Sequence, residues 1–562
     1  MSSKRLPMHA GEAVVEALQQ ESVDRVYSVP GSHIHPIYDA LSRADSIRLV
    51  TCKMEPNVSL MAEAHGRLTR KPGVCLVTAG PGSVNSMAGV AQAYGAASPL
   101  VHISGAVPLT AKREAFHGVD EPGFANEMFN PITKWSARVE HLADVPEMMA
   151  QAFHIACSGR PGPVHVELPR LSDYSDCILQ EAPDVLSIYQ TIATAVPHPE
   201  PEDVDRFARA LMTAKTPVLA AGKGIIRRDA MRELATLAEK LQAAVIFAQD
   251  AIGVIAEDHP FCAGHFSDFQ PHPLCAEVLE DADLVLCIGM RMGTAEMAAL
   301  AKLAPDVSKI VIGFDNAANS RSSGDYQCVA DPKLFLSALL TRLEHKQDPH
   351  NESLIRQLAM GKAAIRRKLA AQNEQHRSTR PIHPALVIEA LNAVLDDEAV
   401  VASDVGTCQI WARWQRRITR PESFMQSGVW NAMSYALPTA MVAKFEFPGR
   451  DVVALAGDGA FLMTIGDLPT AAEYGANILM VVTNNGSFGQ TLMQQANIYG
   501  HIYGTTFHSP NFAEIANACH AHGIRVTDAK DITAALRQGL AITKQKPALV
   551  EVMVGDHPYP KL

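Results

Sequence analysis

The chain has 562 residues, of which 47% are hydrophobic and 19% charged, and its formal net charge at pH 7 is −11. Its length predicts three or four domains of roughly 150 residues each, with three as the starting number, and its composition is that of an ordinary globular protein. It contains no dense Lys/Arg block and no uninterrupted apolar stretch of about 18 residues, so nucleic acid and membranes are not predicted partners.

The ten cysteines are scattered without a CxxC pair, which argues against a zinc ribbon or a dithiol redox site. The first residues include basic side chains but no apolar segment of the kind that follows them in signal peptides. We therefore expect a soluble cytoplasmic protein with reduced thiols.

Short apolar runs alternate with amphipathic stretches along the chain. The pattern begins with RVYSVP at 25–30, restarts with TPVLAAG at 216–222 and restarts again with AVVASDVG at 399–406. Repeated strand and helix units of this kind predict an α/β fold with three doubly wound parallel sheets. Polar, proline-rich joins at about 172–200 and 345–382 divide it into predicted domains 1–175, 199–345 and 381–562.

Two motifs follow apolar strands in the last domain. Gly-Asp-Gly-Ala at 457–460 follows DVVALA, and Asn-Asn at 484–485 follows ILMVVT, so that Asn485 comes 27 positions after Asp458. Either motif alone could be a turn or a loop. Together they place oxygen ligands at neighbouring strand ends, where open α/β sheets bind ligands and where Mg²⁺ commonly bridges a carboxylate to phosphates.

With these motifs the chain resembles, over essentially its whole length, the thiamin-diphosphate enzymes of the acetolactate synthase, benzoylformate decarboxylase, pyruvate decarboxylase and benzaldehyde lyase group. The resemblance implies a pyrimidine-binding, a central and a diphosphate-binding domain. It also implies that Asp458, Asn485 and Ser487 hold Mg²⁺. It assigns further cofactor contacts to Gly457, Gly459, Ala460, Asn485, Ser487, Phe488 and Gly489.

Two more segments of the last domain resemble cofactor-binding segments of that group. SDVGTCQIW at 403–411 resembles the second diphosphate loop, with Thr407 and Cys408 at the contacting positions. A buried small side chain explains Cys408 equally well. SGVWNAMSYALPTA at 427–440 resembles the segment that bends the cofactor over Met433, for which an ordinary core methionine is the alternative.

In the first domain, Glu55 falls on the group's activating glutamate, which hydrogen-bonds the cofactor's pyrimidine ring. It closes an apolar strand and precedes proline. TAGPGSVN at 78–85 resembles the adjoining loop and puts Pro81, Gly82 and Asn85 near the cofactor. Glu63, eight residues after Glu55, is expected to be a charge on a helix surface.

The sequence indicates the substrate less clearly than it indicates the cofactor. The resemblance places His33 near the reactive carbon, and His117 stands where relatives carry a pocket glutamine. Both are candidate proton carriers, and a structural loop histidine is the alternative for His117. Gln494 departs from the tryptophan of authentic acetohydroxyacid synthases, so a preference for pyruvate stays open. Arg291 in GMRMG matches flavin-binding relatives, but the rest of their pattern is missing, and bound FAD is not favoured.

The predicted reaction is decarboxylation of a 2-oxo acid followed by capture of a second carbonyl compound or a proton. A lyase that cleaves a 2-hydroxy ketone or a 2-hydroxyacyl-CoA is the alternative, towards which His33 points. A non-catalytic relative is the remote one, because fold alone does not fix function. The resemblance implies a homodimer or homotetramer with sites at subunit interfaces.

Overall fold

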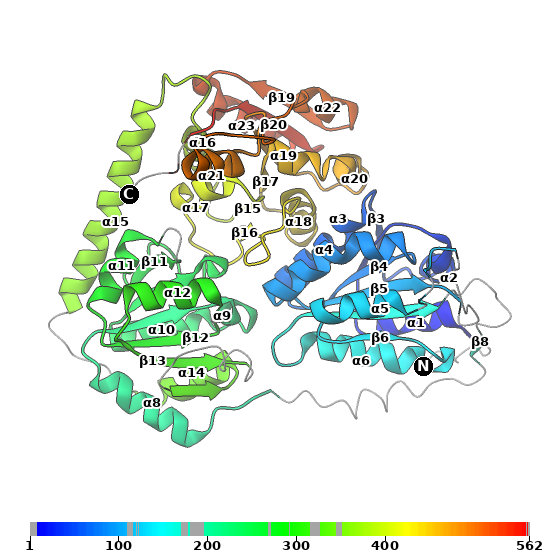
Figure 1. The fold of residues 1–562 in the computed structure, drawn as a ribbon, viewed down its shortest axis with the longest axis horizontal. Coiled ribbons are helices and arrows are strands. Elements are labelled where there is room, and N and C mark those ends of the chain that lie inside the picture. Colours follow the sequence, from blue (N-terminus) through cyan, green and yellow to red (C-terminus); the bar gives the residue numbers. More distant parts are fainter. Residues whose placement is uncertain are drawn as a thin grey trace.

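The computed structural model describes residues 8–108, 116–119, 121, 123–169, 178–179, 196–267, 271–291, 293–314, 326–343, 351–557 and 559. Within these residues, three six-stranded parallel sheets carry helices on their faces, which confirms the predicted fold class. Figure 1 shows the N-terminal domain in blue and cyan, the central domain in green and the C-terminal domain in yellow to red.

Three of the inner strands of the N-terminal sheet are short and buried on both faces, as expected for a covered parallel sheet. In spatial order its strands are β3 (Arg48–Thr51), β2 (Arg25–Ser28), β4 (Gly73–Val77), β5 (Leu100–Ala106), β7 (Pro163–Pro169) and β6 (Ser136–Arg138). Its helices are α1 (Ala10–Gln20), α2 (His35–Leu41), α3 (Glu55–Thr69), α4 (Pro81–Ala96), α5 (Phe124–Phe129) and α6 (Val145–Cys157). A small antiparallel pair joins β1 (Met8–His9) to β8 (Ile178–Leu179).

The central sheet has a different strand order. Its strands are β11 (Cys262–Phe266), β10 (Ala244–Ala248), β9 (Pro217–Ala221), β12 (Leu284–Ile288), β13 (Ser308–Gly313) and β14 (Tyr326–Val329). Its helices are α8 (Pro201–Thr213), α9 (Lys223–Arg227), α10 (Met231–Leu241), α11 (Pro273–Glu280), α12 (Thr294–Leu303) and α14 (Pro332–Leu340).

The C-terminal sheet repeats the topology of the N-terminal one. Its strands are β16 (Phe424–Gln426), β15 (Val400–Ser403), β17 (Val452–Gly457), β18 (Leu479–Asn484), β20 (Ala548–Met553) and β19 (His522–Val526). Its helices are α16 (Pro384–Val394), α17 (Thr407–Gln415), α18 (Ala436–Glu446), α19 (Asp458–Leu462), α20 (Leu468–Glu473), α21 (Gly489–Tyr499), α22 (Phe512–Ala518) and α23 (Ile532–Ile542). In both terminal domains the strand order reverses between the first and third strands, which is where open α/β sheets bind ligands.

The polar join at 345–382 contains a helix, α15 (Asn351–Gln375), that the sequence pattern did not predict. Figure 1 shows it running along one side of the central and C-terminal domains. Leu358 and Leu369 are buried, but most of the helix is exposed, so its apolar stripe is too sparse to stand out. No helix among the described residues is long and apolar enough to cross a bilayer.

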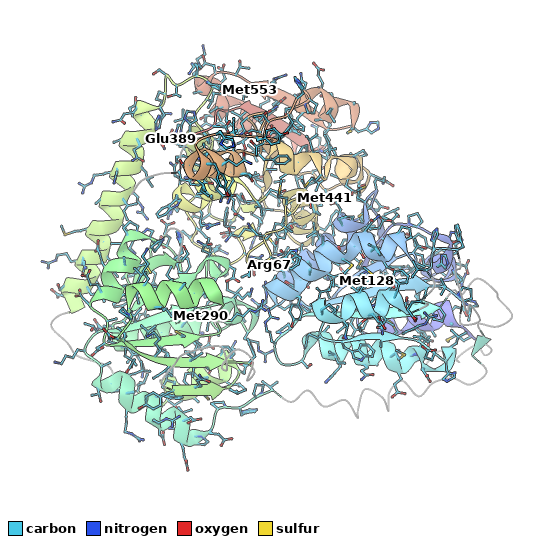
Figure 2. All side chains as sticks on the ribbon, viewed as in Figure 1. Arg67, Met128, Met290, Glu389, Met441 and Met553 are labelled. Atoms are coloured by element: carbon cyan, nitrogen blue, oxygen red, sulfur yellow. The ribbon has the colours of Figure 1, made fainter. Side chains whose placement is uncertain are left out.

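The three domains meet around Arg67 of α3, which lies near the centre of Figure 2. Its guanidinium donates to Glu422, 3.1 Å away, to the Gln426 carbonyl oxygen and to the Tyr435 hydroxyl. Arg227 of the central domain also donates to Glu422, at 2.9 Å. Burial alone would raise the pKa of Glu422, but the two arginines hold it below its ordinary value.

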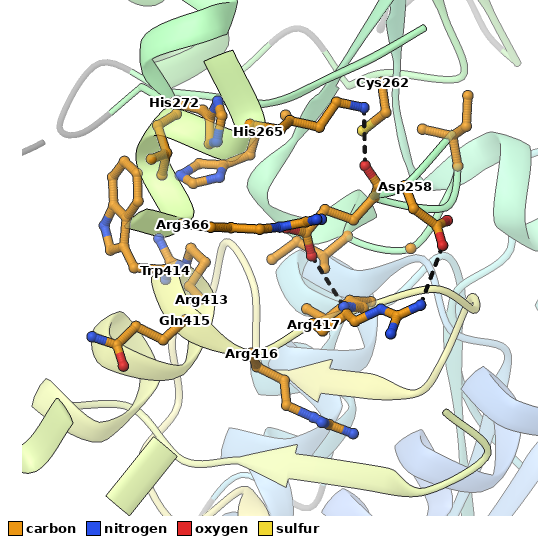
Figure 3. Close-up of a pocket in the computed structure, with 18 of the residues that line it drawn as sticks. Asp258, Cys262, His265, His272, Arg366, Arg413, Trp414, Gln415, Arg416 and Arg417 are labelled. Carbon is orange, nitrogen blue, oxygen red and sulfur yellow. Dashed lines mark hydrogen bonds and ion pairs between the residues drawn. The ribbon is translucent and has the colours of Figure 1, made fainter. Parts of the chain in front are cut away.

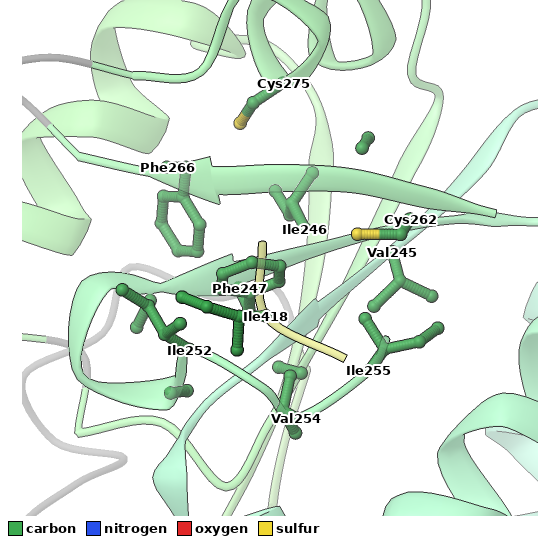
Figure 4. Packing of buried hydrophobic residues seen from close by; sticks show 14 of the residues in the cluster. Val245, Ile246, Phe247, Ile252, Val254, Ile255, Cys262, Phe266, Cys275 and Ile418 are labelled. Carbon is green, nitrogen blue, oxygen red and sulfur yellow. The ribbon is translucent and has the colours of Figure 1, made fainter. Parts of the chain in front are cut away.

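Apolar packing also crosses a domain boundary. In Figure 4, Ile418 from the C-terminal domain lies among the buried side chains of the central domain, near Phe247 and Ile252. The described core of the central domain therefore continues into the C-terminal domain rather than ending at its own surface.

Candidate active site

Glu55 is the first residue of α3 and is half-buried. The amide nitrogen of Asn85, in the second turn of α4, donates to the Glu55 carboxylate at 3.2 Å. The two residues reach each other because the strands that precede them, β3 and β4, both flank β2 and run parallel to it. Two residues that the resemblance assigns to the pyrimidine site are thus in contact.

The turn that precedes α4 packs closely against the backbone of His117. Gly80 has a φ of 60°, and a Cβ at that position would lie 2.3 Å from the His117 carbonyl oxygen. Glycine is required there on both grounds. Pro81 and Gly82 open the helix beneath, and a Cβ on Gly82 would meet Thr78 at 2.9 Å. His117 therefore lies over the predicted pyrimidine loop.

His33 and His117 are brought together from distant parts of the chain. Their rings are stacked with centroids 5.0 Å apart, and the Phe116 ring stacks on His117 at 4.0 Å. His33 is 1% exposed, and its Nδ1 lies 3.4 Å from the Thr78 hydroxyl oxygen. Phe116 is 68% exposed. Both predicted proton carriers thus share one edge of the N-terminal sheet, beside an aromatic surface.

The prediction for Glu63 was wrong, because this carboxylate is fully buried. It accepts a hydrogen bond from the Ser98 hydroxyl at 2.8 Å, and burial raises its pKa even though Arg67 is nearby. The run VSLMAEAHG around it is nearly free of large polar side chains, which is the signal that a buried helix face gives.

Asp458 joins the two loops that the sequence placed side by side. Its carboxylate accepts from Gly459 N at 2.9 Å, from Gly486 N at 2.7 Å and from the Ser509 hydroxyl at 2.6 Å. It is 1% exposed, burial raises its pKa, and no described cationic side chain forms an ion pair with it. A buried carboxylate with neutral donors only fits a bound hard cation.

Asn485 presents its amide in one orientation. The amide nitrogen donates to the Ser487 hydroxyl at 2.9 Å and to Asp556 Oδ1 at 2.7 Å, which leaves the amide oxygen for another ligand. The Ser487 hydroxyl donates to the same Asp556 oxygen at 3.0 Å. Sequence reasoning missed Asp556, although it follows β20, the strand beside β18, as the predicted ligands follow theirs.

Space for an anion lies beside the loops that follow β15 and β17. A Cβ at Gly406 or at Gly457 would meet no atom within 4 Å, so these backbones face open space. Thr407 begins α17 next to the first of them, and Ala460 is buried next to the second. Backbone that can be approached this closely fits a diphosphate.

The remaining predicted contacts close around the same loops. A Cβ at Gly459 would lie 2.7 Å from the Phe488 ring. One at Gly489 would lie 2.7 Å from the Asn485 amide nitrogen and 3.4 Å from the Thr407 methyl group. The structure thus gathers these predicted residues into one cluster at the carboxyl edge of the C-terminal sheet.

Asp404, which sequence reasoning did not single out, ties two of the predicted segments together. Its carboxylate accepts from Val405 N at 2.9 Å and from Ala436 N at 3.2 Å, so it fixes the segment that carries the half-buried Met433. Cys408 is buried, with its thiol 3.6 Å from the Asp404 carbonyl oxygen, which favours the filler interpretation over cofactor contact.

Burial raises the pKa of Asp404 to about 6, from an ordinary value of 3.8. The stability that the protonated group contributes is therefore fully present below the unfolded-state pKa and is lost as the pH rises through about 6. We expect Asp404→Asn to remove this dependence. In urea unfolding of the cofactor-free chain between about pH 4 and pH 8, wild-type stability should fall by about 3 kcal/mol relative to the variant. A difference that stays constant with pH would contradict the assignment.

Comparison with known protein families agrees with this arrangement. Residues 8–126 match the N-terminal TPP binding domain, 204–339 the central domain and 404–552 the C-terminal TPP binding domain of thiamine pyrophosphate enzymes. The fold and the comparison together show that the chain belongs to the family of enzymes dependent on thiamine pyrophosphate, that is, thiamin diphosphate. The resemblance noted in the sequence is confirmed.

The similarity to individual relatives extends along the whole chain. An acetolactate synthase of Mycobacterium bovis is 30% identical over 553 residues, covering 97% of this chain and 88% of the relative. The acetolactate synthase isozyme 1 large subunit of Escherichia coli is 28% identical over 560 residues, covering 98% and 95%. A probable acetolactate synthase large subunit of Methanococcus aeolicus is 28% identical over 566 residues, covering 97% and 92%. The chain is an acetolactate synthase-like enzyme that depends on thiamin diphosphate.

Proposed function

We propose that this enzyme removes CO2 from a 2-oxo acid and joins the remaining acyl carbon to a second carbonyl compound, with Mg²⁺ as the metal. The observation that carries the proposal is the buried Asp458 carboxylate, which pairs with no described cationic side chain and accepts a hydrogen bond from Gly486 in the loop of Asn485. The relatives named acetolactate synthase support the ligation step.

Asp458, Asn485 and the backbone oxygen of Ser487 would hold Mg²⁺, and the backbone around Gly457 would hold the diphosphate. Bound thiamin diphosphate supplies a nucleophilic carbon and an acceptor for the electron pair that CO2 leaves behind. Glu55, positioned by Asn85, would hydrogen-bond the pyrimidine nitrogen and hold the proton that activates the cofactor.

The paired histidines would handle protons on the substrate side. His33 is held by Thr78 and stacked on His117, so each ring restricts the orientation of the other. A neutral imidazole can accept a proton from a hydroxyl group or return one to a carbonyl oxygen near neutral pH. Phe116 would exclude water from this end of the site.

We propose a homodimer or homotetramer whose sites form between subunits. Exposed apolar side chains flank both halves of the predicted site: Met54 and Val84 beside Glu55, and Leu462 and Met463 at the end of α19. Apolar side chains around a polar centre are typical of subunit interfaces.

We also propose a cytoplasmic location, because the described cysteines have free thiols, as is usual in a reducing compartment.

A lyase that cleaves a 2-hydroxy ketone or a 2-hydroxyacyl-CoA is the second candidate function. The stack of Phe116, His117 and His33 favours it, because an aromatic surface beside a base suits deprotonation of an aryl-substituted alcohol.

Flavin is not part of the proposed set of cofactors. In the central sheet, a Cβ at Gly222 would lie 2.4 Å from the Gly289 oxygen, so the strand-end loops pack on each other where a dinucleotide would lie.

The substrate test uses the full chain with added thiamin diphosphate and Mg²⁺. We expect CO2 release from at least one acid of a 2-oxo acid panel, together with an acyloin or 2-hydroxy-2-acyl acid detected by mass spectrometry. CO2 with an aldehyde alone would reduce the function to decarboxylation. Aldehyde release from 2-hydroxy ketones or 2-hydroxyacyl-CoA, without CO2 from any acid, would favour the lyase.

A further inference from the structure

A cavity lies between the central and C-terminal domains, and it is separate from the predicted active-site residues. Its volume is about 680 Å³, within the range of small-molecule sites. It is bounded by the edge strand β11, by the long helix α15 and by the end of α17 with the residues that follow it. None of the residues assigned above to the cofactor or the substrate lines it.

The walls carry more positive than negative charge. Five Lys or Arg side chains line the cavity against three Asp or Glu side chains: Lys362, Arg366, Arg413, Arg416 and Arg417 against Glu257, Asp258 and Asp397. In a chain with a net charge of −11, a local excess of cations at a cavity indicates an anionic ligand.

Three of these cations, Lys362, Arg413 and Arg416, have only neutral partners among the described residues. Arg413 donates to the amide oxygen of Gln409 at 3.1 Å, and no described carboxylate forms an ion pair with it. Its Nε is buried without a hydrogen bond, and burial lowers its pKa to about 10. Lys362 donates to the carbonyl oxygens of Glu257 and His259, at 3.2 and 2.7 Å. Arg366 pairs loosely with Glu257 at 4.0 Å, and Arg417 pairs with Asp258 at 3.3 Å and with Asp397 at 3.6 Å.

Flat rings line one end of the cavity. Figure 3 shows Trp414, His265 and His272 gathered there beside Arg413, with Arg417 and Asp258 towards the other end. Trp414 and His272 are parallel with centroids 6.0 Å apart, and His265 meets Trp414 edge-on at 5.2 Å. The indole and imidazole rings form an aromatic surface next to the guanidinium of Arg413, which has no described carboxylate partner.

We propose that this cavity binds a phosphorylated ligand with a flat ring, of the nucleotide class. The ring stacks against Trp414, and the phosphate accepts hydrogen bonds from Arg413 and Arg366. Charge-assisted bonds of this kind neutralise the excess positive charge of the walls. The proposal does not depend on which carbonyl substrate the enzyme uses.

The test is calorimetric titration of the full chain, saturated with thiamin diphosphate and excess Mg²⁺, with ADP, adenosine and inorganic phosphate. Saturating the cofactor site prevents ADP from binding at the loops of Asp458. We expect ADP to bind at one site per chain. Adenosine and phosphate, which each offer half of the contacts, should bind at least about tenfold more weakly.

Three variants locate the site. Arg413→Gln and Trp414→Leu should each weaken ADP binding by at least about tenfold. Arg356→Gln, an exposed position ten residues before Arg366 on α15, should leave it unchanged. Should Arg413→Gln fail to fold, Arg366→Gln replaces it, because that side chain is 56% exposed and its loss leaves no buried gap.

Absence of saturable ADP binding would overturn the proposal. So would ADP binding that survives both Arg413→Gln and Trp414→Leu. Binding that is lost in Arg291→Gln but kept in those two variants would place the nucleotide at the strand ends of the central sheet instead, and it too would overturn the proposal.

Discussion

Glu55→Gln should lower turnover by a factor on the order of 10² to 10⁴ while thiamin diphosphate still binds. The amide keeps the shape of the side chain and its contact with Asn85, but it cannot hold or share the activating proton. Steady-state rates with the best substrate, together with calorimetric cofactor affinity, would show a large fall in kcat and a change in affinity of less than about tenfold.

Glu63→Gln is the matched control, because the same change is made eight residues later on the same helix. Glu63 is bonded to Ser98 in the interior of the protein, so its variant should change thermal stability rather than kcat. Equal losses of activity in both variants would mean that Glu55 has no special part in the reaction.

Asp458→Asn should weaken Mg²⁺-dependent binding of thiamin diphosphate by at least about a hundredfold. The amide can still accept from Gly486 and Ser509, so the loops should keep their positions, but the charge that a cation needs is gone. Cofactor affinity measured over a series of Mg²⁺ concentrations checks this result.

Asp451→Asn serves as the control for that experiment, because it lies just before the opposite end of the same strand, β17, and pairs with Lys544 on the surface. Unchanged cofactor affinity in Asp458→Asn at every Mg²⁺ concentration would remove Asp458 from the metal site.

The parallel sheets were predictable because their strands are continuous Val, Ile and Leu runs with helical patterns between them. The runs near 25–30, 216–222 and 399–406 became β2, β9 and β15. Helix α15 was not predictable in the same way. It packs against other elements through few side chains, such as Leu358, and a helix that is polar nearly all round gives no periodic signal.

Within the candidate site, the sequence identified residues in motifs at strand ends, such as Asp458 and Asn485. It did not identify Asp404, Ser509 or Asp556, whose contacts depend on how distant segments pack. Nor could spacing alone show that Glu63 is buried, because a carboxylate on a helix is usually solvated. The stacking of His33 on His117 likewise arises only from tertiary packing of the loop over Gly80.

Arg67 has a consequence for how the whole chain unfolds. Its guanidinium and that of Arg227 share the single carboxylate of Glu422, and these three residues come from three different domains. Separating the C-terminal domain would leave both buried guanidinium groups without their carboxylate, at a cost of several kcal/mol, and separating either other domain would remove one of the two partners of Glu422. The domains are therefore thermodynamically coupled, and heating should melt them in one cooperative transition rather than in three separate ones.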